Sequence, residues 1–138
     1  MSSNYKLKDK VAVITGGGSG IGQSTAICFA REGAKVCILD INLEHASKVK
    51  EKIENDGGKA LAIKCDINSP LEIELGFKAA MEQWGRVDIL FANAGIAGEM
   101  APIETLNVDD WDRTINTNLR GTFLTVKYAI PFLKENGG

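Results

Sequence analysis

The chain has 138 residues, of which 44% are hydrophobic and 25% are charged, and its formal net charge is −2. This length corresponds to one domain or part of one, and the composition is that of an ordinary soluble globular protein. There is no basic block, and no apolar run approaches the roughly 18 residues of a membrane span. Neither a nucleic-acid partner nor a membrane is therefore expected. The N-terminal residues contain no hydrophobic leader, which favours a cytoplasmic protein.

Residue types that bind metals are scarce in this sequence. The three cysteines, Cys28, Cys37 and Cys65, form no Cys-x-x-Cys pair, and each lies in an apolar stretch. They are predicted to be buried free thiols in a reducing compartment. The only histidine, His45, lies in a polar helical stretch and is interpreted as a solvated surface residue. No metal site is predicted.

The first half of the chain alternates between apolar strands and helical patterns. Strands are predicted over 10–15, 35–39 and 60–65, and helices over 19–32 and 42–55. Continuous apolar runs of this kind are typical of parallel strands that are buried on both faces. Each helix has one stripe of residues expected to face inward: Ile21, Thr25, Cys28 and Phe29 in the first, and Leu43, Ala46, Val49 and Ile53 in the second.

The second half continues this alternation. A capping box at Ser69 and Glu72 begins a helix that ends at Gly85, a strand follows over 87–92, and a helical pattern covers about 108–134. Strict alternation predicts an α/β fold, a Rossmann-like doubly wound parallel sheet with strand order 3-2-1-4. No change in composition marks a domain boundary, so residues 1–138 are treated as one unit.

A glycine-rich turn follows the first predicted strand, with the sequence Thr15-Gly16-Gly17-Gly18-Ser19-Gly20-Ile21-Gly22. The backbone N–H groups and the dipole of the next helix suit such a turn to a phosphate or pyrophosphate. Glycine also lets the phosphate approach the backbone closely. A glycine cluster alone is weak evidence and can also be a flexible loop, but the flanking strand and helix favour phosphate binding. No Gly-Lys-Ser/Thr follows, which excludes a P-loop.

Polar or small residues also follow the other predicted strands. Asp40 ends the second strand, Asp66 follows the third, and Asn93-Ala94-Gly95 follows the fourth. Ligands of doubly wound sheets bind beyond the carboxyl ends of the strands, so these residues are candidate ligand-binding groups. The spacing from Gly22 to Asp40 is close to the ~20 residues at which an acid meets the adenosine ribose. A carboxylate there favours NAD, because it would repel the extra phosphate of NADP.

The glycine turn resembles the cofactor-binding turn of the short-chain dehydrogenase/reductase family, which has the pattern Thr-Gly-x-x-x-Gly-x-Gly. The resemblance extends over essentially the whole chain. In that family an Asp at the position of Asp66 contacts the adenine ring, and Asn-Ala-Gly after the fourth strand braces the sheet. The resemblance implies a set of NAD-binding residues: Gly16, Ser19, Gly20, Ile21, Gly22, Asp40, Asp66, Ile67, Asn93, Ala94 and Gly95.

The segment Asn116–Gly121 is similar to the family segment whose Asn, here Asn118, helps to hold a water molecule in a proton relay. Asn and Gly both weaken a helix, so a local irregularity that frees backbone carbonyls for water is expected here. A solvated polar helix face is the alternative interpretation. The resemblance thus makes Asn118 the candidate catalytic residue of this chain.

The family's catalytic Ser and its Tyr-x-x-x-Lys pair are not present. The residues four positions after Tyr5 and Tyr128 are Asp9 and Phe132. The resemblance therefore implies the N-terminal, cofactor-binding half of a single short-chain dehydrogenase domain, truncated before the fifth strand. The complete enzyme is expected to transfer a hydride between NAD(H) and a small-molecule alcohol or carbonyl substrate, and to form a dimer or tetramer. The chain alone is expected to be inactive.

Two alternatives remain open at this point. The chain could be a truncated relative that binds a dinucleotide or a partner chain without catalysis. It could also belong to another Rossmann enzyme, such as an epimerase or extended-type reductase, although those more often carry Gly-x-x-Gly-x-x-Gly. In the 138-residue chain by itself, the strand over 87–92 is expected to have an unpaired edge, and a stripe of the long helix is expected to be exposed. Both should promote self-association. That stripe contains Phe123, Val126, Ile130 and Leu133.

Overall fold

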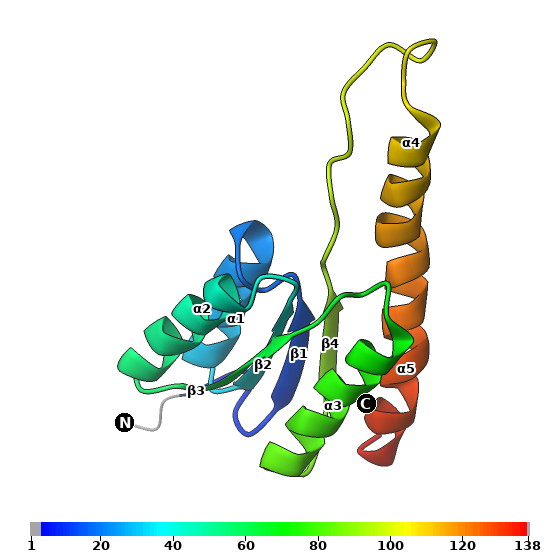
Figure 1. The fold of residues 1–138 in the computed structure, drawn as a ribbon. Coiled ribbons are helices and arrows are strands. Elements are labelled where there is room, and N and C mark those ends of the chain that lie inside the picture. Colours follow the sequence, from blue (N-terminus) through cyan, green and yellow to red (C-terminus); the bar gives the residue numbers. More distant parts are fainter. Residues whose placement is uncertain (1–3, 138) are drawn as a thin grey trace.

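The computed structural model describes residues 4–137, which form one parallel sheet with helices on both faces (Figure 1). The strands are β1 (Val11–Thr15), β2 (Lys35–Asp40), β3 (Lys59–Lys64) and β4 (Ile89–Ala92). The helices are α1 (Gly20–Arg31), α2 (Leu43–Asn55), α3 (Pro70–Trp84), α4 (Val108–Ile115) and α5 (Gly121–Glu135). The π-helical turn η1 (Asn116–Arg120) joins the last two. Residues 1–3 and 138 of the predicted domain lie outside the described part.

The sheet has the predicted order β3-β2-β1-β4, and every pairing is parallel. Helices α1 and α2 cover one face, and α3 and α5 cover the other (Figure 1). Alternate residues of β1 therefore enter different cores: Val11 and Val13 pack on the α3 side, and Ile14 packs on the α1 side. Because both faces are covered, all of β1 is buried, which explains its uninterrupted apolar sequence.

One predicted strand boundary and one predicted cap differ from the structure for identifiable reasons. Strand β4 begins at Ile89 instead of at residue 87, because the Asp88 side chain accepts the Val11 N–H at 2.9 Å and replaces a strand carbonyl there. The capping box at Ser69 is only half formed. The Ser69 hydroxyl accepts the Glu72 N–H at 3.3 Å, but the Glu72 carboxylate accepts the N–H of Asp66 instead of that of Ser69.

The predicted inward face of α1 is wrong in part: Phe29 packs against the core and Thr25 is half-buried, but Ile21 and Cys28 are not buried. Cys28 is exposed and Ile21 is 73% exposed, whereas Gly22 and Ala26 are buried. Gly22 and Ala26 lie one turn apart and have little or no side chain, so the helix can approach the sheet closely along this side. Residue 28 points away from that side. The stripe predicted for α2 is buried from Ala46 to Ile53, but its first member, Leu43, is exposed.

Cys37 and Cys65 are buried as predicted, whereas the predicted burial of Cys28 is wrong, because its side chain is exposed on α1. Burial raises the pKa of each thiol to about 12, and weaker charge effects act in the same direction. Both groups therefore stay protonated at neutral pH and are poor nucleophiles. Within residues 4–137, no group of three or more side chains is placed to hold a metal ion.

The β4 side of the molecule is open. Among the described strands, β4 pairs only with β1, and the loop over 93–107 leads to α4 well beyond the sheet (Figure 1). An exposed stripe of apolar side chains runs along α4, η1 and α5, which together form a helical arm: Trp111, Ile115, Leu119, Phe123, Val126 and Ile130. The exposure of Phe123, Val126 and Ile130 was predicted, whereas Leu133 packs partly against the core. No helix in residues 4–137 has the length and apolarity needed to cross a membrane.

Candidate functional site

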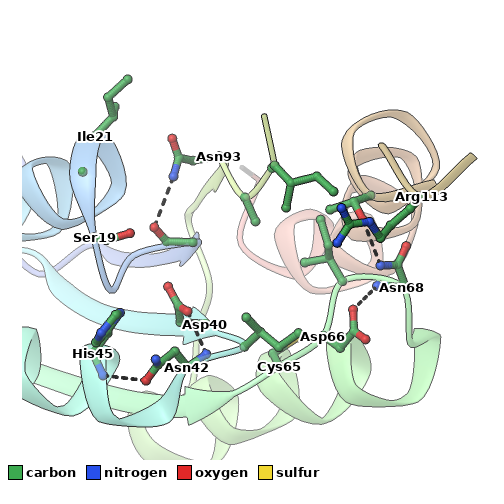
Figure 2. Close-up of a pocket in the computed structure, with 18 residues that line it drawn as sticks. Ser19, Ile21, Asp40, Asn42, His45, Cys65, Asp66, Asn68, Asn93 and Arg113 are labelled. Carbon is green, nitrogen blue, oxygen red and sulfur yellow. Dashed lines mark hydrogen bonds between the residues drawn. The ribbon is translucent and has the colours of Figure 1, made fainter. Parts of the chain in front are cut away.

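A cavity of about 660 Å³ lies where the carboxyl ends of the four strands meet (Figure 2). Every turn that follows a strand contributes to its wall. The predicted site residues that line it are Gly16, Ser19, Gly20, Ile21, Asp40, Asp66, Ile67, Asn93, Ala94 and Gly95. The remaining two, Gly22 and Asn118, lie behind the wall and contact residues that form it.

Close packing of Gly22 against Gly16 and Asn93 holds the glycine turn in shape. A Cβ atom at Gly22 would collide with the Gly16 carbonyl oxygen and would lie 2.6 Å from Asn93 Nδ2. Gly20, in contrast, has a φ of +54° and faces open space at the cavity. The Ser19 side chain makes no capping hydrogen bond, so it leaves the first N–H groups of α1 available to an anion.

Asp40 stands at the cavity wall with both carboxylate oxygens bound to backbone donors. Oδ2 accepts the Gly18 N–H and Oδ1 accepts the Asn42 N–H, each at 2.9 Å. A carboxylate has about four acceptor sites, so it can still accept hydroxyl groups from a ligand. Asn42 in turn caps α2 by accepting the His45 N–H at 3.1 Å. His45 is exposed, as predicted, but it also lies at the cavity (Figure 2).

Asp66 is fixed by the turn that follows β3. Its backbone N–H donates to the Glu72 carboxylate at 2.6 Å, and its Oδ1 accepts the Asn68 N–H at 2.9 Å. Ile67, the next residue, is 6% exposed and packs closely against Gly121. A Cβ atom at Gly121 would lie only 2.6 Å from Ile67 Cδ1. This end of the cavity therefore offers a carboxylate beside an apolar surface.

Asn93 joins the end of β4 to the glycine turn. The Thr15 hydroxyl oxygen accepts the N–H groups of Asn93 and Ala94 at 3.0 and 3.1 Å. Asn93 Nδ2 donates to the carbonyl oxygens of Thr15 and Gly16 at 3.2 and 3.3 Å. These bonds cross between β1 and β4 and fix the relative position of two walls of the cavity.

Asn118 binds the loop that follows β4. Its Oδ1 accepts the Ile96 N–H and its Nδ2 donates to the Ile96 carbonyl, both at 2.8 Å. The predicted irregularity is present as the π-helical turn η1. The Asn118 carbonyl, however, accepts the Thr122 hydroxyl at 2.9 Å, so this carbonyl has one acceptor site already in use. Asn118 thus acts on the cavity through Ile96.

Several residues at the cavity were not predicted: Ile41, Asn42, His45, Cys65, Asn68, Ile96, Arg113 and Thr117. Most of them adjoin predicted residues in the sequence, and extending each strand end by two positions would have found them. Arg113 and Thr117 come from α4 and η1 (Figure 2). Their spacing of four places them on one helix face, but the sequence gives no local signal that this face meets the end of β3.

Comparisons with known proteins agree with this architecture. Residues 10–138 match the family model of the short chain dehydrogenases. The cyclohexanol dehydrogenase of Acinetobacter sp. (strain SE19) is 41% identical over 133 residues, which cover 96% of this chain and 53% of that protein. The chain therefore spans about half the length of the curated relatives that it matches.

Two crystal structures of relatives contain a nicotinamide cofactor. The 3-ketoacyl-(acyl-carrier-protein) reductase from Brucella melitensis, complexed with NADH, is 40% identical with a TM-score of 0.88, and the match covers 96% of this chain and 53% of that one. The NAD⁺-bound xylitol dehydrogenase is 30% identical with a TM-score of 0.91, covering 95% and 50%. Because the family model accounts for nearly the whole chain and both the sheet order and these structures agree with it, this chain belongs to the short-chain dehydrogenase/reductase family.

Proposed function

We propose that the chain is the cofactor-binding half of an oxidoreductase that transfers a hydride between NAD(H) and an alcohol or carbonyl compound. The observation that carries the proposal is the cavity in which the residues after all four strands converge. The relatives support the reaction class, since their names describe dehydrogenases of cyclohexanol and xylitol and a ketoacyl reductase. Cytoplasmic location and homo-oligomerisation of the complete protein are part of the same proposal.

The residues that line the cavity fit a dinucleotide. The volume of about 660 Å³ lies within the range of about 300–1,000 Å³ that is usual for ligand sites. The open space at Gly20 and the start of α1 suit the pyrophosphate, and Asp40 suits the ribose hydroxyls. Asp66 and Ile67 together suit the adenine ring. When bound, the nicotinamide ring supplies the hydride chemistry, and the protein binds and orients it.

We assign Asn118 to positioning within this site. Its two hydrogen bonds to Ile96 fix the backbone just beyond Asn93-Ala94-Gly95, where Ile96 lines the cavity. A proton relay needs water molecules held at defined places, and a fixed backbone carbonyl or amide can hold them. The π-helical turn supports this assignment, because such turns are frequent at functional sites.

A second candidate function has one specific observation in its favour. The sequence contains no Tyr-x-x-x-Lys, so it lacks the pair that the resemblance requires for acid–base chemistry. By itself the chain is therefore proposed to bind NAD(H) without turning over an alcohol. An NADH-coupled assay with the purified chain tests this, and turnover would show that its catalytic groups are different ones.

Cofactor choice gives the sharpest test of the proposal. The Asp40 carboxylate should repel the extra phosphate of NADPH, so the chain should bind NADH about tenfold or more tightly than NADPH. Asp40→Ser should reduce this difference, and Asp40→Asn separates loss of charge from loss of shape. Fluorescence titration with both cofactors measures the ratio. Asp56→Asn, which removes an exposed carboxylate elsewhere, is the matched control. Tighter binding of NADPH by the parent would rule out this role of Asp40.

A further inference from the structure

The π-helical turn η1 touches both ends of the cavity. On the side of β3, Asn68 Nδ2 donates to the Thr117 hydroxyl at 3.2 Å, and Arg120 donates to the Asn68 carbonyl at 3.4 Å. On the side of β4, Asn118 holds both backbone groups of Ile96 at 2.8 Å. A single helical turn therefore joins the segment that carries Asp66 to the loop that follows β4.

Close packing accompanies these hydrogen bonds. A Cβ atom at Gly121, directly after η1, would lie 2.6 Å from Ile67 Cδ1. A Cβ atom at Gly95 would lie 3.0 Å from Asn118 Oδ1. Tightly packed contacts of this kind transmit small displacements instead of absorbing them. The turn after β3, η1 and the loop that carries Ile96 are therefore in close contact with one another.

Asn68 is the incompletely satisfied member of this connection. Its side chain lies next to Asp66 at the cavity (Figure 2). The Oδ1 atom is buried, and none of residues 4–137 donates a hydrogen bond to it. A hydroxyl both donates and accepts, so Thr117 can pair with either the nitrogen or the oxygen of the Asn68 side-chain amide. Whichever of these two atoms does not face Thr117 stays unpaired. Such an atom is unfavourable, and Thr117 supplies the hydrogen bond that the described residues make to the Asn68 side-chain amide.

We propose that Asn68 is a positioning residue that connects the adenine end of the cavity to the Asn118–Ile96 pair. Occupation of the site beside Asp66 and Ile67 by an adenine nucleotide fixes Asn68, and Asn68 acts through Thr117 and η1 to hold Asn118 against Ile96. The inference rests on the proposed function, because it requires an adenine nucleotide to bind at that end. A path of contacts does not by itself demonstrate coupling, so coupling is measured at one atom.

The Ile96 amide proton is a suitable reporter, because its acceptor is Asn118 Oδ1. Hydrogen exchange at this amide is measured in the 138-residue chain with and without AMP, a probe that carries the adenine half of the cofactor and no nicotinamide. AMP should slow the exchange severalfold in the parent. Thr117→Val keeps the shape of the side chain but removes the hydroxyl, and it should abolish this response. Thr117→Ser keeps the hydroxyl and should restore it.

Variants without ligand give a second measurement. Asn68→Ala should speed exchange at the Ile96 amide by about threefold or more, as expected for loss of one hydrogen bond that supports the pair. Ser69→Ala is the matched control. It removes the cap of α3 in the same turn, and the Ser69 hydroxyl bonds to Glu72 and not to η1. Exchange at Ile96 in this variant should equal that of the parent.

The outcomes separate this inference from the function on which it rests. If AMP shifts the amide resonances of Asp66 and Ile67 but leaves exchange at Ile96 unchanged, the coupling is refuted and the proposed function stands. If neither AMP nor NADH shifts any resonance of the cavity residues, the proposed function fails and the inference fails with it. Equal exchange rates in the parent and Asn68→Ala would also overturn the role given to Asn68.

Discussion

Asn118 and Asp88 have similar roles at opposite ends of β4. Each uses its side chain to bind a backbone group of a neighbouring segment: Asn118 binds Ile96, and Asp88 binds the Val11 N–H. Asp88 also receives two hydrogen bonds from Arg86, at 2.8 and 2.5 Å. Replacing the two side chains should have different effects, because Asn118 lies beside the cavity and Asp88 lies far from it. Substitutions at these positions should therefore separate function from stability.

Replacing Asn118 should impair turnover more than cofactor binding. Asn118→Leu removes both hydrogen bonds to Ile96 while leaving the residues that line the dinucleotide cavity unchanged. In a catalytically competent protein that contains this chain, kcat should fall strongly, and NADH affinity should stay within a few-fold of the parent. Steady-state kinetics and NADH titration check this. Parental kcat accompanied only by lower stability would make Asn118 a structural residue.

Replacing Asp88 should lower stability in a pH-dependent way. Burial alone would raise the pKa of Asp88, but hydrogen bonds from Arg86 and Val11 and the charges of Arg86 and Lys10 hold that pKa below its usual value. A lowered pKa stabilises the fold above the unfolded-state value of about 3.9, and this contribution is lost as pH falls through the folded-state pKa. Asp88→Asn should therefore destabilise the chain by about 2 kcal/mol at pH 7.

Urea unfolding at pH 7 and in acid measures the Asp88 effect. The difference between parent and variant should shrink as the pH falls below about 4, because the parent then loses the same charge. Glu44→Gln is the control. Glu44 forms an exposed pair with Lys48, and such pairs contribute little to stability. A difference between parent and Asp88→Asn that is independent of pH would contradict the role of the carboxylate.

At the scale of elements, the sequence predicts the strands and their order well and the inward faces of helices less well. Uninterrupted apolar runs identify buried parallel strands, and alternation with helices limits their order. The irregularity at η1 was predictable because Asn116, Asn118 and Gly121 all disfavour a regular helix. The inward side of α1 was not, because close packing there selects Gly22 and Ala26 instead of large apolar residues.

The candidate site shows the same division. Residues at strand ends, such as Asp40 and Asn93, could be predicted because parallel strands bring their carboxyl ends together. Arg113 could not, since its place at the cavity depends on the path of the loop over 93–107. Asn68 could not for another reason. Its contact with Thr117 joins two segments far apart in the chain, and neither segment alone signals the contact.

The turn between β1 and α1 can be tested with two glycines that share a left-handed backbone conformation. Gly20 and Gly57 both have positive φ, at +54° and +86°, and a Cβ atom at either position would meet nothing within 4 Å. Alanine at each should therefore cost about 1 kcal/mol of stability. Only Gly20 lines the cavity, so Gly20→Ala should also weaken NADH binding. Equal NADH affinity in the two variants would count against phosphate binding at this turn.

At the scale of the whole molecule, two features leave apolar or unpaired groups accessible. Strand β4 is an edge of the described sheet, and the exposed stripe runs along the helical arm. Unprotected edges and large apolar patches both promote association. The chain by itself is therefore expected to self-associate, and size-exclusion chromatography at several concentrations measures this.

A charged residue in the exposed stripe should reduce this association. Phe123, 60% exposed, lies in the middle of the stripe, and Phe123→Lys should shift the chain toward smaller species. Leu71 is similarly exposed, at 65%, but lies on α3 outside the stripe. Leu71→Lys should leave the elution profile unchanged. A parent that elutes as a monomer at every concentration would contradict the expectation.

The position of β1 in the middle of the sheet has a consequence for how the chain folds. Strand β1 pairs with β2 after a short crossover. Its pairing with β4 joins much more distant segments, and the hydrogen bond that the Asn93 N–H donates to the Thr15 hydroxyl spans 78 residues. Contacts between distant parts of a chain form slowly, because a long loop must close first. During synthesis, the first three strands are complete before β4 has left the ribosome. We therefore expect the cavity at the strand ends to be the last part of this molecule to form.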